Sequence, residues 1–260
     1  MKKCRPIIAI SLKMYMSPEQ TRVWMQEVMA ILPPDLGSFT DFVVAPSFVS
    51  ISDVRSICMN TPQGGHLDIG GQDVFWEDSG AYTGEVSAPM LRDSGCRYAE
   101  IGHAERRRLF GETDTITAKK FAACARSGLI PILCVGESFR GTAKEAAEAC
   151  IAQINAARSL SPDDTPFVVA WEPVWAIGAE EPAEVAYIHA VGGALKEALK
   201  ATSGGRLMYG GSAGPGMFEM ICDVVDGLFL GRFAHKPQNV RLVLNDVKRV
   251  VQARSTMSNP

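Results

Sequence analysis

The sequence predicts a (β/α)8 barrel, a closed ring of parallel strands in which each strand is followed by a helix. Short apolar runs alternate with amphipathic stretches along the 260 residues, and eight such pairs can be counted. Helix-start signals separate the pairs, and polar or glycine-rich segments follow several of the apolar runs. We expect one domain over residues 1–260, and an open doubly wound sheet is the alternative architecture.

The predicted strands are short runs rich in apolar and β-branched residues, as expected of strands buried on both faces. In chain order they are Ile7–Leu12, Asp41–Ala45, His66–Gly70, Tyr98–Ile101, Ile130–Val135, Phe167–Trp171, Arg206–Tyr209 and Gly227–Leu230.

The predicted helices follow these strands one by one and have apolar residues at helical spacing. They are Pro18–Ile31, Val49–Met59, Ala88–Ser94, Thr115–Ser127, Thr142–Ser159, Pro182–Thr202, Pro215–Asp223 and Pro237–Arg254. Ser17 before Pro18 is a typical N-cap, and Glu181-Pro182 and Lys236-Pro237 open later helices in a similar way.

The composition narrows the class of protein. The chain is 47% hydrophobic and 21% charged with a net charge of -3, and it has no basic patch, which argues against nucleic-acid and membrane partners. Seven widely spaced cysteines are typical of buried thiols in a reducing compartment, and no Cys/His cluster indicates a metal. Without a signal-like start or a membrane-length apolar segment, we expect a soluble, cytoplasmic protein.

One connection is too long and too apolar for an ordinary loop. Residues Gln72 to Ala88 include Phe75, Trp76 and Tyr82, which would be unfavourable if left bare in water. We therefore expect this loop to dock into a second subunit.

Glu172 is the first catalytic candidate. It follows the strand Phe167–Trp171, at the end of the strand where barrels of this class keep their active sites. The apolar flanks Pro173 and Trp175 are expected to raise its pKa toward that of a general base. Gly178 gives the chain a free hinge, so the segment before it could close as a lid. The alternative is a surface glutamate on an ordinary loop.

His103 and Lys13 stand at two other strand ends. His103 follows Tyr98–Ile101 and precedes a helical turn, whose N–H groups are expected to lower the imidazole pKa and keep the ring neutral. Lys13 closes the first strand, where a cation suits an anionic substrate. Taken singly, a surface histidine and a lysine at a sheet edge are the commoner interpretations.

Glycine-rich turns follow the seventh and eighth strands, at Tyr209–Gly216 and Leu228–Arg232. Such turns expose backbone N–H groups, and phosphate binds in this part of many barrels. A base, a neutral imidazole, a lysine and a phosphate nest together indicate proton abstraction next to a carbonyl on a small phosphorylated sugar.

Six motifs carry a resemblance to a known family. They are Leu12-Lys13-Met14, Thr83-Gly84-Glu85, Ile101-Gly102-His103-Ala104-Glu105-Arg106-Arg107, Cys134-Val135-Gly136-Glu137, Trp171-Glu172-Pro173-Val174-Trp175-Ala176-Ile177-Gly178 and Tyr209-Gly210-Gly211-Ser212. In this order they resemble triosephosphate isomerase over essentially the whole chain. The resemblance implies a homodimeric (β/α)8 barrel that needs no cofactor and no metal, with Thr83 near the partner's Lys13.

The resemblance also implies site roles. Pairing a base with a neutral imidazole is the arrangement for which triosephosphate isomerase itself is the standard example, so these roles are not an independent derivation. The implied roles are Glu172 as base, His103 as electrophile, Lys13 as substrate-binding cation, Glu105 as supporting carboxylate, and Gly178, Ser212 and Gly231 in the phosphate nest.

Four positions depart from the family pattern. Ser11 replaces an asparagine, Ala104 replaces a serine, Arg232 replaces a second glycine, and Ala179–Pro182 is shorter than the usual hinge. The changes at Ser11 and Arg232 resemble the tetrulose-phosphate branch, the L-erythrulose-1-phosphate isomerases. They place both residues in the substrate pocket and favour a four-carbon substrate over that of an authentic triosephosphate isomerase.

Two further classes stay open from the sequence. Lys13 could form a Schiff base with substrate, as in an aldolase, and borohydride trapping would reveal that imine. A sensor that binds a sugar phosphate without turnover is the alternative outside enzymes, and the altered segment Ala179–Pro182 is its only support.

Overall fold

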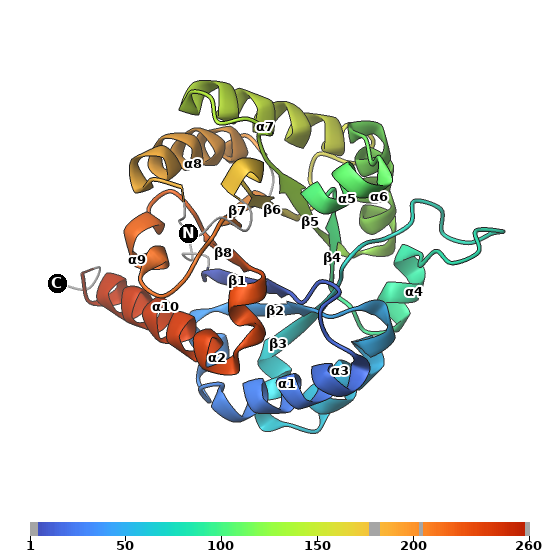
Figure 1. The fold of residues 1–260 in the computed structure, drawn as a ribbon, viewed down its shortest axis with the longest axis vertical. Coiled ribbons are helices and arrows are strands. Elements are labelled where there is room, and N and C mark those ends of the chain that lie inside the picture. Colours follow the sequence, from blue (N-terminus) through green and yellow to red (C-terminus); the bar gives the residue numbers. More distant parts are fainter. Residues whose placement is uncertain (1–4, 177–182, 203–204, 258–260) are drawn as a thin grey trace.

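The computed structural model describes residues 5–176, 183–202 and 205–257, and these residues form a closed parallel barrel (Figure 1). Each strand pairs with its neighbour in sequence, and β1 pairs with β8 to close the ring. The strands are β1 (Ile7–Ser11), β2 (Asp41–Ala45), β3 (Leu67–Gly71), β4 (Tyr98–Ile101), β5 (Ile130–Val135), β6 (Phe167–Trp171), β7 (Gly205–Tyr209) and β8 (Gly227–Leu230). The predicted barrel is confirmed, and the open doubly wound sheet is wrong.

Helices form an outer layer around the barrel (Figure 1). They are α1 (Pro18–Ile31), α2 (Leu36–Phe39), α3 (Ile51–Met59), α4 (Ala88–Asp93), α5 (Ala104–Phe110), α6 (Asp114–Ser127), α7 (Ala143–Arg158), α8 (Val185–Lys200), α9 (Met217–Ile221) and α10 (Pro237–Met257), with 3-10 turns η1 (Phe48–Ser50), η2 (Pro62–His66), η3 (Val174–Ala176) and η4 (Arg232–His235). No helix within the described ranges has both the length and the apolar character needed to cross a bilayer.

The predicted strand ends agree with the structure to within one residue, whereas the helices differ more. Helix α5 was not predicted because it buries none of its side chains and so lacks an apolar period. The short helix α2 was also not predicted. The predicted start at Val49 falls in the turn η1, and helix α9 is shorter than Pro215–Asp223 at both ends. The predicted start at Pro182 lies outside the described residues.

Helix starts are set by the residues predicted to cap them. The Ser17 hydroxyl accepts a hydrogen bond from the Gln20 N–H, and the Gln20 side chain accepts one from the Ser17 N–H, which completes a capping box. Pro237 opens α10 as expected. These caps fix where each helix begins relative to the strand before it.

The barrel interior determines which side chains reach its mouth. Because successive strand residues point to opposite faces, the inner face is formed by every second residue. This inner cluster consists of Ile7, Ala9, Val43, Tyr98, Ile132, Cys134, Val168, Ala170, Met208 and Phe229. Ser11, Glu100 and Glu172 each stand two residues beyond a member of this cluster. The alternation therefore turns all three inward at the C-terminal end of the barrel.

The loop between β3 and α4 projects away from the barrel (Figure 1). Its aromatic residues pack on each other: the Phe75 ring lies 4.1 Å from that of Trp76 and 4.7 Å from that of Tyr82, centroid to centroid. Phe75 is buried, but the Tyr82 side chain stays 44% exposed. The loop thus has its own small apolar cluster and still presents an apolar surface.

Candidate active site

A pocket of about 850 Å³ opens at the C-terminal mouth of the barrel. The ends of β1, β6, β7 and β8 and the loops that follow them form its walls. Seven of the nine residues proposed from the sequence line it: Ser11, Lys13, Glu105, Glu172, Ser212, Gly231 and Arg232. His103 is buried behind the lining, and Gly178 lies outside the described residues.

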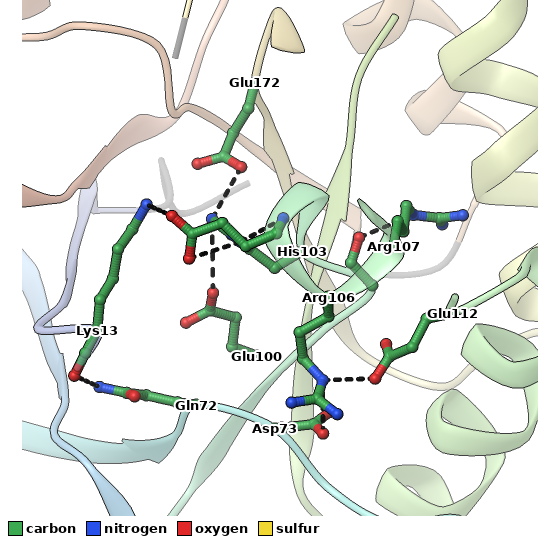
Figure 2. Close-up of polar contacts among 11 residues, drawn as sticks. Lys13, Gln72, Asp73, Glu100, His103, Arg106, Arg107, Glu112 and Glu172 are labelled. Atoms are coloured by element: carbon green, nitrogen blue, oxygen red, sulfur yellow. Dashed lines mark hydrogen bonds and ion pairs between the residues drawn. The ribbon is translucent and has the colours of Figure 1, made fainter. Parts of the chain in front are cut away.

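His103 and Glu172 meet at this mouth (Figure 2). The His103 Nε2 atom lies 3.3 Å from Glu172 Oε2, and both residues are buried. Gly210 makes the position of Glu172 possible, because a Cβ atom at Gly210 would lie only 2.6 Å from Glu172 Cγ. A proton acceptor and an imidazole therefore face each other, both largely buried, at the floor of the pocket.

Lys13 forms an ion pair beside them. Its Nζ atom is 2.8 Å from Glu105 Oε1. Burial lowers the pKa of Lys13, but the bond to Glu105 and the charges of Glu105, Glu172 and Glu100 together outweigh burial and raise the pKa above its usual value. Burial likewise raises the pKa of Glu105 while Lys13 lowers it, and the net result is a lowered pKa. Lys13 consequently stays cationic at the mouth of the barrel.

The backbone of Lys13 is held in an uncommon conformation. Its φ of 53° is the only left-handed value at a non-glycine position within the described ranges. Such a backbone costs on the order of 1–3 kcal/mol and persists only where its surroundings impose it. Gln72 provides one restraint, since its side-chain amide donates to the Lys13 carbonyl at 3.1 Å and to the Ala45 carbonyl at 2.9 Å.

The pKa expected for His103 was wrong. Burial lowers it, but the charges of Glu172 and Glu100 outweigh burial and raise the pKa to about 9. The helix N-terminus acts differently: the Glu105 N–H donates to His103 Nδ1 at 3.1 Å. This bond uses the Nδ1 lone pair and favours the neutral ring, whereas the two carboxylates favour the cation. In both forms Nε2 carries a proton and faces Glu172. His103 is thus oriented as a donor into the pocket.

An ionic cluster fixes helix α5, which carries Glu105 in its first turn (Figure 2). The Arg106 Nε atom lies 2.8 Å from Asp73 Oδ2 and 2.5 Å from Glu112 Oε1. Lys120 on α6 contacts the same two carboxylates at 2.6 and 2.5 Å. Because these charges are largely buried and paired, the cluster restrains α5 and hence the His103 ring that caps it.

Glu137 holds the end of strand β6, just before Glu172, through hydrogen bonds. Glu137 accepts hydrogen bonds from Trp171 Nε1 at 3.1 Å, from Trp175 Nε1 at 2.9 Å and from the Tyr187 hydroxyl at 2.9 Å. These bonds tie β6 and the turn η3 to helix α8. The proposed hinge Gly178 and the segment Ala179–Pro182 lie outside the described residues.

The turns after β7 and β8 form a further wall of the pocket. Ser212 and Gly231 both line it, and a Cβ atom at Gly231 would lie 3.8 Å from Lys13 Cε. Arg232 begins the turn η4 and is exposed at the pocket rim. The predicted phosphate-binding turns therefore lie beside the reacting groups: the β7 turn is next to Glu172 through Gly210, and the β8 turn is next to Lys13.

Glu100 is the site residue that the sequence analysis missed. It is 3% exposed, and its Oε1 atom lies 3.9 Å from His103 Nε2 (Figure 2). Burial raises its pKa to about 7, although His103 and a hydrogen bond from the Ser11 side chain act in the opposite direction. Its Oε2 atom is buried and has no hydrogen-bond partner among the described residues. The available signal was an acidic residue at an inward position of an apolar strand.

This burial predicts a pH-dependent gain in stability for Glu100→Gln. The folded protein holds the Glu100 proton up to about pH 7, whereas an unfolded glutamate releases it near 4.5. The contribution of the Glu100 proton to the free energy of unfolding is therefore fully present below the pKa of the unfolded state. It is lost as pH rises through the pKa of the folded state, and the loss is on the order of 3 kcal/mol. We expect the thermal midpoint of the variant to exceed that of wild type at about pH 8 and to match it near pH 4.5. An equal difference at both pH values would contradict this.

The closed barrel with an acid, an imidazole and a lysine at one buried mouth is the architecture of an isomerase that moves protons between neighbouring carbons. The chain belongs to the triosephosphate isomerase family, whose sequence model matches residues 6–247. The resemblance inferred from the motifs is thereby confirmed, and so is the assignment to the isomerases.

Two relatives of this chain are named as isomerases of different substrates. The chain is 46% identical over 249 residues to an L-erythrulose-1-phosphate isomerase of Pectobacterium atrosepticum, which covers 92% of this chain and 94% of the relative. It is 40% identical over 238 residues to a triosephosphate isomerase of Moorella thermoacetica, and this match covers 87% of this chain and 92% of the relative. Among solved structures, triosephosphate isomerase of Bartonella henselae matches with a TM-score of 0.78 at 28% identity, covering 95% of this chain and 100% of that one.

Proposed function

We propose that this protein isomerises L-erythrulose 1-phosphate by moving its carbonyl group to the neighbouring carbon through a cis-enediol. The contact that carries the proposal is the 3.3 Å approach of Glu172 to His103, beside the cationic Lys13. The similarity to an L-erythrulose-1-phosphate isomerase and the departures at Ser11 and Arg232 favour the four-carbon substrate.

In the proposed reaction the phosphate lies against the turns after β7 and β8, where Ser212, Gly231 and Arg232 line the pocket. Backbone N–H groups and the Arg232 guanidinium suit an anion there. Gly178 is proposed to complete this phosphate site. The carbonyl end of the substrate then points toward Glu172, His103 and Lys13.

Glu172 takes a proton from the carbon next to the carbonyl and returns it to the former carbonyl carbon. Between these steps negative charge develops on the carbonyl oxygen, where Lys13 stabilises it and the Nε2–H of His103 donates a proton to it. His103 then takes the hydroxyl proton from the neighbouring carbon, which becomes the new carbonyl carbon. Glu105 holds Lys13 in place through its 2.8 Å ion pair. Every proton moves between the substrate and these side chains, so the proposed reaction requires neither a cofactor nor a metal.

Parallel assays of L-erythrulose 1-phosphate and dihydroxyacetone phosphate test the substrate. We expect kcat/KM for the tetrulose to exceed that for the triose by at least ~10-fold, which corresponds to about 1.4 kcal/mol of transition-state binding. A preference for the triose would refute the tetrulose assignment and support the second candidate, an authentic triosephosphate isomerase, which the Moorella relative favours.

The proposed assembly is a homodimer joined through the loop 72–88. Tyr82 on this loop is 44% exposed, and apolar side chains are also exposed near the β1 and β2 ends, Met14 at 95% and Val49 at 75%. Such a surface is unfavourable in water and would be covered by a second copy. The same contact would bring Thr83 of one subunit toward the partner's Lys13.

A further inference from the structure

Glu100 has no part in the proposed proton transfer, and yet it lies beside the reacting groups. A buried carboxylate with an unpaired oxygen weakens a fold unless something binds to it. Its Oε2 atom is such an oxygen, and burial raises the pKa of Glu100 because the charged form is destabilised in the folded protein. An unpartnered acceptor at the barrel mouth indicates a position for a ligand donor.

The position of Glu100 is fixed relative to the two reacting side chains, His103 and Glu172. Its Oε1 atom lies 3.9 Å from His103 Nε2, and the same nitrogen lies 3.3 Å from Glu172 Oε2. A substrate carbon that loses its proton to Glu172, with an oxygen on His103 Nε2, therefore lies next to Glu100. Figure 2 shows Glu100 and Glu172 approaching the His103 ring from opposite sides.

The neighbours of Glu100 are polar but leave it a free acceptor. Ser11 from β1 lines the pocket and hydrogen-bonds to the Glu100 carboxylate, while His103, Glu172 and Lys13 are the charged groups that act on it. Glu100 is not itself among the residues that line the pocket, whereas Ser11, to which it hydrogen-bonds, is. The pair Ser11 and Glu100 thus provides a donor or acceptor hydroxyl and an acceptor carboxylate at one place.

The chemistry of the substrate matches this place. L-Erythrulose 1-phosphate differs from dihydroxyacetone phosphate by a hydroxymethyl group on the carbon that loses its proton. With the phosphate against the β7 and β8 turns, that carbon and its substituent lie at the Glu172 side of the pocket. The additional hydroxyl is a hydrogen-bond donor that the triose lacks.

We propose that Glu100 and Ser11 form a subsite that binds the hydroxymethyl group of a four-carbon substrate and thereby sets the preference for tetrulose over triose phosphates. The proposal rests on the proposed isomerase function. Sites built to bind a substrate hydroxyl reject analogues that lack it, because their buried polar groups are then left unpaired.

Two variants of Glu100 test the subsite. Glu100→Leu keeps a similar volume but removes the acceptor, and Glu100→Gln keeps hydrogen-bonding groups. We expect the leucine variant to lose at least ~100-fold in kcat/KM for L-erythrulose 1-phosphate and less than ~10-fold for dihydroxyacetone phosphate, with the glutamine variant losing less for the tetrulose. Equal losses for both substrates would overturn the subsite, since Glu100 would then act only through His103.

Ser11→Ala provides a second test that leaves the buried carboxylate in place, in case the leucine variant does not fold. We expect it to lower kcat/KM for the tetrulose by about 10-fold, the loss of one hydrogen bond, with a smaller change for the triose. A uniform change for both substrates would contradict a role for Ser11 in the subsite.

Binding without turnover separates this inference from the proposed function. Calorimetry on wild type and Glu100→Leu should compare D-erythritol 4-phosphate with glycerol 3-phosphate, which lacks one hydroxymethyl unit. We expect wild type to bind the tetritol phosphate at least ~10-fold more tightly and the leucine variant to lose this difference. If turnover favours the triose while this difference is seen, the function assignment fails and the subsite stands. Equal binding of the two probes by wild type would overturn the subsite.

Discussion

Glu172→Gln is expected to lower kcat by at least ~100-fold, the low end for loss of a general base. The amide has the shape of the carboxylate but cannot accept the substrate proton. Its neighbours stay in place, because Gly210 still leaves room for the side chain and His103 Nε2 can still donate to the amide oxygen. The loss should therefore fall on kcat, while the binding of glycerol 3-phosphate changes little.

The matched control for this variant is Glu27→Gln. Glu27 is exposed on helix α1, outside the pocket lining, so the same chemical change there should leave kcat unaffected. Circular dichroism and thermal melting of both variants verify that each is folded. Turnover of Glu172→Gln close to that of wild type would show that another group is the base.

Deletion of residues 75–82 is expected to give monomers with little activity. The deletion removes Phe75, Trp76 and Tyr82, the aromatic cluster that the projecting loop presents. Without it the exposed surface near Lys13 has no partner to cover it, and the backbone of Lys13 loses the support that the proposed dimer gives. Sedimentation gives the mass, and kcat/KM gives the activity.

The control for the deletion is Phe139→Ser, which changes an 86% exposed aromatic residue between β5 and α7. We expect this variant to sediment and react as wild type does, because Phe139 lies outside the loop. A wild-type protein that sediments as a monomer with full activity would contradict the proposed assembly.

The strands and the mouth of the barrel could be predicted because both depend on local pattern. Runs such as Phe167–Trp171 are buried on both faces, and the residue after each run must lie at the barrel rim. Once the strands form one closed ring, Lys13, His103 and Glu172 lie near each other whatever the loops do. This is why the site could be assembled from residues far apart in sequence.

The electrostatics could not be predicted in the same way. The pKa of His103 depends on Glu172 from the end of β6 and Glu100 from β4, and their distances to the ring follow from barrel geometry. The helix N-terminus was visible in the sequence, but the two carboxylates outweigh it. Helix α5 was not predicted for another reason. It has no apolar face, and ionic contacts such as that of Arg106 with Asp73 stabilise it.

Exchange of the substrate proton with solvent tests the central claim most directly. Wild-type protein, Glu172→Gln and Glu27→Gln are each incubated with L-erythrulose 1-phosphate in deuterated water, and nuclear magnetic resonance follows deuterium at the carbons next to the carbonyl. The account predicts enzyme-dependent deuterium incorporation with wild type and Glu27→Gln, and a rate lower by at least ~100-fold with Glu172→Gln. Undiminished incorporation by Glu172→Gln would contradict the account, because the proton would then pass through a different group.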